Sequence, residues 1–245
     1  MINLIHPLLV CLICLTLQVS MAQSTPRDES QLLAKWEAGN TISTENIALH
    51  GVEKCFSAHP IDDAIFQRIK GLSYKDDCTL PLSELRYLRL LHYDAEGNIA
   101  LGEMICNRSI SDDLLYIFRT LFDSHYRIER IILVDEYGAD DNRSMVDNNS
   151  SAFNFRFISG TTRLSRHSLG LAVDINPLYN PYVRQSDERL IVDPIESMEY
   201  VDRTKSFPYK IDTTDLCYKL FKSRGFEWGG EWHSLKDYQH FEKNH

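Results

Sequence analysis

An aspartate lies in an apolar stretch of this sequence, where an isolated charge is unfavourable. Asp174 falls within the short apolar run 171–175, which predicts a buried strand. Burying a carboxylate there costs free energy unless the group is paired with a cation or bound to a metal. His167 lies seven residues upstream, before a glycine turn at Gly170, and is a candidate partner.

A second acid–imidazole pair lies near the end of the sequence, in the segment Asp237-Tyr-Gln-His240. Two imidazoles and one carboxylate are a common ligand set for a catalytic Zn²⁺, which keeps a fourth position open for water. His167, Asp174 and His240 therefore predict a zinc site, where the metal lowers the pKa of the water. Asp237 is the candidate general base that takes the water's proton and passes it to the departing amine. From spacing alone, the alternative is a structural His–Asp pair and an exposed histidine near the terminus.

The segment SRHSLGLAVD, residues 165–174, resembles the SxHxxGxAxD motif of the M15 metallopeptidases. This family includes zinc D,D-carboxypeptidases, D-Ala-D-Ala dipeptidases and L-alanyl-D-glutamate endopeptidases. The resemblance extends over about residues 140–242. It implies that His167, Asp174 and His240 bind zinc and that Asp237 is the general base. The ending, GGEW at 229–232 followed by DYQHFE at 237–242, is most similar to the endopeptidase branch.

The resemblance also implies an arginine, upstream of the zinc-binding histidine, that holds a carboxylate or carbonyl of the substrate. Arg143 and Arg156 both lie in the expected stretch, and the sequence does not choose between them. Ser165 opens the motif and is a candidate for a hydrogen bond near the metal, or for fixing the turn. We expect the nearby Arg163 and Arg166 to be solvated.

Four more residues of the C-terminal segment have two interpretations each. Glu231 is an alternative base, and a supporting or surface position is its simpler interpretation. His233 is an alternative metal ligand. Trp228 and Trp232 are candidates for lining a cleft, although aromatic residues beside glycine are more often part of the core.

The rest of the chain predicts a mixture of helices and strands. Residues 86–93 and 99–106 are β-prone runs around a short glycine-containing loop, which is typical of a hairpin. Helical spacing predicts helices at 31–38, at 61–69, at 111–122 with Ser111 as a cap, and from Thr213 or Thr214 to 224. Further strands are predicted at 130–135, 152–158, 171–175 and twice near the end, with a long polar loop at 137–151.

Because strands and helices do not alternate strictly, the predicted class is α+β, a small antiparallel sheet with helices packed on it. The resemblance implies the M15 (hedgehog/DD-peptidase-like) metallopeptidase fold. No internal repeat or linker divides the chain after its N-terminal segment.

The N-terminal residues predict export. Residues 8–19 are apolar and have the length of a signal-peptide core, and Ser20-Met-Ala22 permits cleavage after Ala22. This run is shorter than the roughly 20 residues of a membrane span. An uncleaved anchor is the alternative, because no Lys or Arg precedes the run. We expect a signal peptide at 1–22, a lead-in at 23–60 and a peptidase domain at 61–245, in a periplasmic or extracellular protein that contacts a membrane only if uncleaved.

The composition indicates which kinds of partner the protein is unsuited to bind. The 245 residues are 43% hydrophobic and 25% charged, with a formal net charge of −9. An acidic protein is a poor candidate for binding nucleic acid or an anionic membrane, and nothing implies a protein partner. Four cysteines remain after the predicted signal, which permits two disulfides in any of three pairings, with a free buried thiol as the alternative for the last of them: Cys55, Cys78, Cys106 and Cys217.

Together with the ligand pattern, the resemblance to the M15 family implies a zinc metallopeptidase that hydrolyses an amide bond in peptidoglycan stem peptides, foremost between L-Ala and D-Glu. A D,D-carboxypeptidase or dipeptidase of the same family is the nearest alternative. A domain that binds wall peptides or metal without turnover is another. A structural protein, in which the His–Asp–His cluster only forms hydrogen bonds in the core, predicts no stoichiometric zinc.

Overall fold

The computed structural model describes residues 26–158, 160–186 and 189–244. The six α-helices in these residues are α1 (Pro26–Lys35), α2 (Thr44–His50), α3 (Asp63–Ile69), α4 (Ser111–Asp123), α5 (Asp141–Val146) and α6 (Leu216–Ser223). Nine strands are described: β1 (Ser57–Pro60), β2 (Leu85–Tyr93), β3 (Ile99–Asn107), β4 (Ala172–Asp174), β5 (Tyr182–Gln185), β6 (Leu190–Asp193), β7 (Glu227–Trp228), β8 (Lys236–Asp237) and β9 (His240–Glu242). They form three antiparallel sheets of three strands each, so the α+β class is confirmed.

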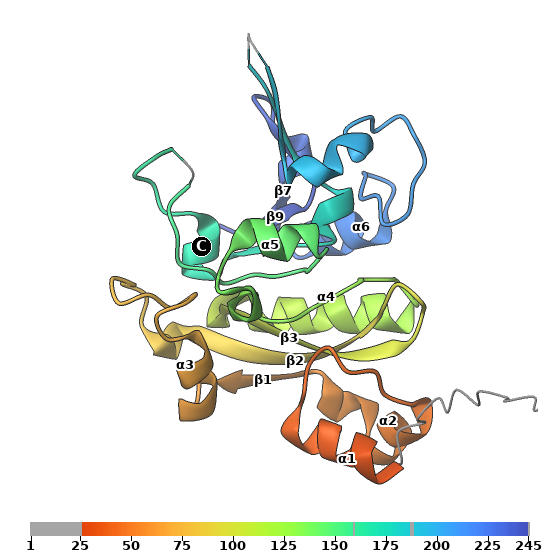
Figure 1. The fold of residues 1–245 in the computed structure, drawn as a ribbon. Helices are drawn as coiled ribbons and strands as arrows, with labels where there is room; N and C mark the ends of the chain where they lie inside the picture. Colours follow the sequence, from red (N-terminus) through yellow and green to blue (C-terminus); the bar gives the residue numbers. More distant parts are fainter. Residues whose placement is uncertain (1–25, 159, 187–188, 245) are drawn as a thin grey trace, which may run out of the picture.

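The largest sheet has the order β1-β2-β3 and contains the predicted hairpin, with Leu85 opposite Asn107 and Tyr93 opposite Ile99. Alternate side chains of β2 point to opposite faces of the sheet, and each face is covered by an apolar cluster. Leu88 and Leu90 pack with α4 on one side. Leu85, Tyr87 and Leu91 pack on the other side, towards the N-terminal helices, in a second apolar cluster. Figure 1 shows α1 and α2 on one side of this sheet, and α4, α5 and α6 on the other.

Residues of the predicted lead-in complete one face of this sheet. The Trp36 indole Nε1 donates to the Gly102 carbonyl at 2.9 Å, and Thr41 pairs with Ala100 in an isolated bridge. Leu33, Trp36 and Ile47 are buried there. The predicted signal peptide, 1–22, lies outside the described residues. None of the helices in the part of the chain that the structure describes is long and apolar enough to cross a membrane.

The predicted helices form, although the one predicted at 31–38 lies at Pro26–Lys35 and the caps differ in two cases. Asp62 caps α3 by accepting from the Ile65 amide. Ser111 begins α4 without capping it, because its hydroxyl donates to the Arg108 carbonyl instead. Asp215, and neither threonine before it, caps α6 by accepting from the Cys217 and Tyr218 amides.

Two predicted strands are wrong. Residues 130–135 run beside β3, but Asn149 takes the place of a neighbouring strand: its Oδ1 accepts from the Ile132 amide and its Nδ2 donates to the Ile132 carbonyl. Residues 152–158 are extended without a ladder. The Asn154 and Arg156 amides donate to the turn around His167, whereas the Phe153 and Phe155 amides donate to the Ile105 and Ser73 carbonyls. The predicted polar loop, 137–151, contains α5, which Asp140 caps.

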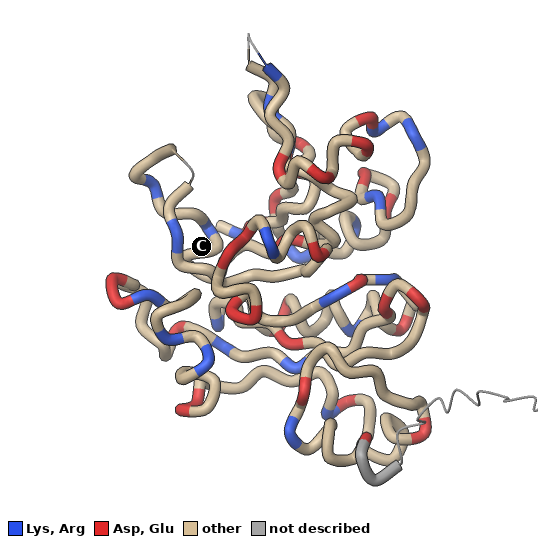
Figure 2. Tube along the Cα trace, in the orientation of Figure 1, with Lys and Arg blue, Asp and Glu red and all other residues tan. Residues whose placement is uncertain are grey.

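Charged residues of both signs are mixed along the chain. Figure 2 shows acidic and basic positions interspersed along the whole described trace. The four cysteines outside the predicted signal are all free in the structure, so the two disulfides that their number permits are not formed. Cys55, Cys106 and Cys217 are buried, and Cys217 is thus the free buried thiol given as its alternative.

Candidate metal centre

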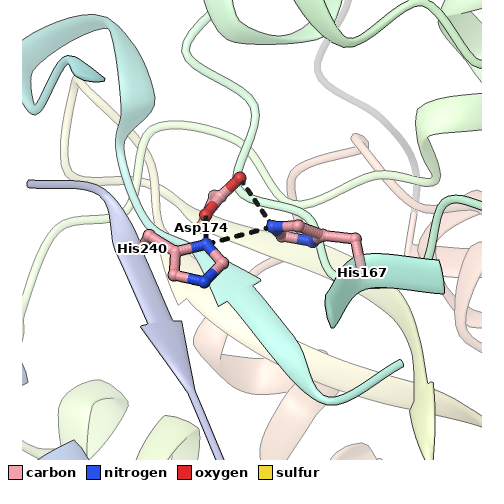
Figure 3. Close-up of side chains that lie close together, drawn as sticks. All are labelled: His167, Asp174 and His240. Atoms are coloured by element: carbon pink, nitrogen blue, oxygen red, sulfur yellow. Dashed lines mark hydrogen bonds and ion pairs between the residues drawn. The ribbon is translucent and has the colours of Figure 1, made fainter. Parts of the chain in front are cut away.

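The two small sheets bring distant parts of the chain together. The sheet β4-β9-β7 pairs Asp174 of β4 directly with His240 of β9. His167 comes from the 3₁₀ turn Arg166–Leu169, just before β4. Figure 3 shows the three side chains converging from these elements. His240 Nδ1 lies 3.1 Å from Asp174 Oδ1, His167 Nε2 lies 3.2 Å from Asp174 Oδ2, and the two ring nitrogens are 3.2 Å apart.

The turn that carries His167 depends on two neighbours. Ser165 caps it, its hydroxyl accepting from the His167 amide at 3.3 Å. Gly170 ends it in the left-handed region, at φ +65°, where a Cβ would lie 2.6 Å from the Asn107 amide nitrogen. A side chain at position 170 would therefore push the turn away from β3. His167 itself is buried, and its Nδ1 donates to the Ala152 carbonyl at 2.5 Å.

In each imidazole the ring nitrogen farther from Asp174, called the outer nitrogen here, has its own hydrogen-bond partner. That partner determines the tautomer of the ring, and so whether the inner nitrogen, nearer to Asp174, carries a lone pair. His167 Nδ1 faces a carbonyl, and His240 Nε2 lies 3.0 Å from Glu242 Oε2, so both outer nitrogens donate. In the neutral rings, the lone pairs of His167 Nε2 and His240 Nδ1 then point at the same space as the Asp174 carboxylate. Three acceptors that converge without a donor require a cation between them.

These three groups fit Zn²⁺ as ligands. In a tetrahedron with bonds of about 2.0–2.1 Å to nitrogen and oxygen, the ligand atoms are about 3.3 Å apart. The three separations here are 3.1 to 3.2 Å. A carbonyl and a carboxylate on the outer ring nitrogens are the usual support for histidines that bind a metal. Ala152 and Glu242 supply that support.

Without a metal, protons compensate the same charges. Burial acts to raise the pKa of Asp174, but His167 and His240 outweigh it and hold that pKa well below its usual range. Burial acts to lower the pKa of His240, but hydrogen bonds to Asp174 and Glu242 raise it to about 10. The site therefore attracts a positive charge strongly, either a proton or a metal ion.

Asp237 lies on β8, at the end of the other small sheet. Its Oδ1 is buried and has no hydrogen-bond partner among the described residues. Burial raises the pKa of Asp237 to about 7; the charge of Asp174 adds to this rise, and those of His240, His167 and Arg156 oppose it. Such a carboxyl group gains and loses a proton near neutrality, as a general base must. Gly229 allows this packing, because a Cβ there would lie 2.5 Å from the Asp237 carbonyl oxygen.

The two candidate arginines differ in position. Arg156 is half-buried, forms an ion pair with Asp141, and its charge acts on Asp237. Arg143 is exposed on α5, where its amide donates to the helix cap Asp140. These observations favour Arg156 over Arg143 as the arginine that holds the substrate. Ser165, the third candidate for contact with the substrate, caps the His167 turn.

The other candidates lie outside the cluster. Glu231 accepts from the Tyr218 hydroxyl and from Lys222, and these hydrogen bonds lower its pKa, so it suits a surface ion pair better than a base. His233 is exposed on a shallow hollow of 760 Å³. The Trp232 ring lies 5.3 Å from that of His240, whereas Trp228 is buried and its Nε1 donates to the Tyr238 carbonyl.

Sequence reasoning missed three groups near the cluster. Glu242 lies two residues after His240, so strand alternation puts it on the same face, and this signal was present in the sequence. The Ala152 carbonyl and Asp141 reach the site only through the path of residues 139–156. No spacing rule places them there.

Comparison with known proteins gives one match. Residues 159–243 match a family model of the M15 peptidases, described as D-alanyl-D-alanine carboxypeptidase. The match includes His167, Asp174, Asp237 and His240, while Arg143 and Arg156 precede it. Neither the curated proteins nor the solved structures give a significant match. The resemblance to the M15 peptidases predicted from the sequence is therefore confirmed over residues 159–243.

Proposed function

We propose that this protein is an exported Zn²⁺-dependent peptidase that cleaves an amide bond in peptidoglycan stem peptides. The observation that carries the proposal is the convergence of three acceptor atoms, from His167, Asp174 and His240, with both outer imidazole nitrogens already donating. The match of the surrounding segment to a family of peptidases supports the reaction class.

His167 Nε2, His240 Nδ1 and a carboxylate oxygen of Asp174 would hold the metal. When bound, Zn²⁺ supplies Lewis-acid activation of a water molecule and of the scissile carbonyl. The outer hydrogen bonds to Ala152 and Glu242 keep the two rings in the tautomers that present these lone pairs.

Asp237 is the proton carrier in this proposal. Its free Oδ1 accepts the proton of the attacking water and then donates it to the nitrogen of the departing amine. The positive charge of Arg156, which acts on Asp237, would stabilise the negative charge that develops on the oxygen of the scissile carbonyl.

Two positions of cleavage are supported by different observations. The GGEW and DYQHFE segments favour the bond between L-Ala and D-Glu, since they are most similar to the endopeptidase branch. The description of the matched family favours removal of a terminal D-Ala. Both reactions use the same ligand set and base, so the product distinguishes them.

Mass spectrometry of purified muropeptides, incubated with zinc-loaded protein, tests the reaction. A fragment cut at L-Ala–D-Glu, absent from a chelated sample and from Asp237→Ala, would support the endopeptidase. Loss of a terminal D-Ala under the same controls would support the carboxypeptidase. One bound zinc per chain with no product from any stem peptide would contradict the peptidase proposal and leave a binding domain.

Export is part of the proposal because the substrate lies outside the cytoplasm. The apolar run 8–19 and the small residues before Gln23 support it. N-terminal sequencing of protein from the periplasm or medium should begin at Gln23. Recovery of the intact N-terminus in the membrane fraction would support an anchor, and recovery in the cytoplasm would contradict export.

A further inference from the structure

Arg156 is held through its backbone by the same turn that carries His167. Its amide donates to the Ser168 hydroxyl at 2.8 Å, and its carbonyl accepts from the Ser165 amide at 3.0 Å. Ser165 and Ser168 flank His167 in sequence and are buried. The Cα of Arg156 is therefore fixed relative to the metal cluster, and only its side chain remains free to choose a rotamer.

One ion pair restricts that choice. The Nε of Arg156 pairs with Oδ2 of Asp141, at the start of α5. The other oxygen, Asp141 Oδ1, accepts from the Asn154 Nδ2 at 2.7 Å. Asn154 is itself buried, and its amide donates to the His167 carbonyl at 3.2 Å. Both carboxylate oxygens of Asp141 are therefore used within one network that ends on the His167 turn.

The pairing at Nε leaves the end of the guanidinium group available. The contact of Nε with Asp141 is an ion pair, and neither Nη atom of Arg156 forms a hydrogen bond with any of the described residues. The two Nη groups form a planar fork that matches a carboxylate or carbonyl oxygen. The positive charge of Arg156 also acts to lower the pKa of Asp237, the proposed base.

We propose that Asp141 is a positioning residue, which holds Arg156 at Nε so that its Nη groups are presented to the carboxylate or carbonyl oxygen of the substrate. This inference rests on the proposed function. Asp141 touches no substrate in this scheme; it reduces the number of side-chain conformations that Arg156 gives up on binding. The side chains of Asp141 and Arg156 are 27% and 32% exposed, and an ion pair with that access to water contributes little to overall stability.

Steady-state kinetics of Asp141→Asn test the inference, with the muropeptide that the wild type cleaves as substrate. We expect kcat/KM to fall about tenfold, mainly through KM, while the melting temperature changes little. Asp147→Asn is the matched control. That residue caps the other end of α5 and binds Arg130 and Tyr137, away from Arg156, so its kcat/KM should stay near the wild-type value.

A double-mutant cycle separates positioning from a general structural role. In an Arg156→Ala background, Asp141→Asn should cost at most about twofold in kcat/KM, because the group that it orients is gone. Equal losses in both backgrounds would overturn the inference, as would a wild-type KM in Asp141→Asn. Asp141→Glu, which keeps the charge, should recover part of the loss.

A second readout does not depend on activity. The Nε–H of Arg156 should give an NMR signal that exchanges slowly with water and disappears in Arg156→Lys. In Asp141→Asn the signal should exchange fast, and in Asp147→Asn it should be unchanged. A protected signal in Asp141→Asn would overturn the inference. If the wild type cleaves no stem peptide but shows this Asp141-dependent signal, the proposed function fails while the ion pair stands.

Discussion

Asp174 and His240 face each other across the ladder between β4 and β9, with Asp174 Oδ1 3.1 Å from His240 Nδ1. The register places these two side chains on the same face of a sheet. A metal ion held by these two side chains would therefore also link β4 to β9. The stability of this sheet should depend on what occupies the space between the side chains.

Removing the metal should lower the melting temperature, and adding Zn²⁺ should restore it. A ligand that binds only the folded state at 100 times its Kd stabilises by about 2.7 kcal/mol. Asp174→Ala should not respond to Zn²⁺, because two imidazoles remain without the carboxylate that joins them. Differential scanning fluorimetry with and without a chelator measures this. Equal responses of wild type and Asp174→Ala would contradict the assigned ligands.

Asp237→Asn should abolish turnover while keeping the metal. The amide is nearly isosteric but cannot accept and return a proton, and loss of a general base typically costs about 10²–10⁴-fold in rate. Zinc content by elemental analysis should stay at one per chain. Glu231→Gln is the matched control, since Glu231 is bound to Tyr218 and Lys222. A larger loss in Glu231→Gln than in Asp237→Asn would exchange their roles.

Much of the fold follows from local signals. Asp62 before an apolar helical pattern predicts α3, and two β-prone runs around Gly97 predict the β2–β3 hairpin. The candidate ligand set is also visible in the sequence, because Asp174 is a charge in an apolar strand. Such signals are readable because each lies within a few residues of the element that it specifies.

The rest depends on contacts between distant residues. Asn149 bonds the backbone of Ile132 as a strand would, so residues 130–135 resemble a strand in sequence and lack a partner strand in space. The difference between Arg143 and Arg156 arises only when residues 152–156 pack against the His167 turn. Neither contact can be predicted from the composition or from the spacing of residue types.

Gly170→Ala should be more destabilising than Gly138→Ala. Both glycines have positive φ, +65° and +71°, so both variants bear the cost of a left-handed residue, about 1–2 kcal/mol. Only at position 170 does the new Cβ meet backbone, 2.6 Å from the Asn107 nitrogen, whereas nothing lies within 4 Å at position 138. Urea unfolding of both variants measures the difference. Gly170→Ala should also bind zinc more weakly, because the displaced turn carries His167. Equal costs would mean that the turn moves freely.

Acid should destabilise the fold through His92, far from the metal centre in sequence. This β2 residue is buried, its Nδ1 lies 2.6 Å from the Ile128 carbonyl, and its Nε2 has no partner among the described residues. Burial lowers the pKa of His92 to about 4, although the hydrogen bond to Ile128 opposes the shift. In the unfolded chain the pKa is about 6.5. Between these two values the unfolded chain binds the proton and the folded chain does not.

The unfolding free energy should therefore be highest above about pH 6.5 and fall progressively to about pH 4, by up to about 3 kcal/mol from this residue. His92→Asn keeps a donor for the Ile128 carbonyl but cannot titrate. It should be less stable than the wild type at neutral pH, yet lose less stability between neutral pH and about pH 4.5. Urea unfolding at both pH values gives the two slopes, and the other titrating groups cancel in their difference. The same slope in both proteins would show that His92 does not contribute, as would an imidazole NMR signal of His92 that titrates near its ordinary pKa.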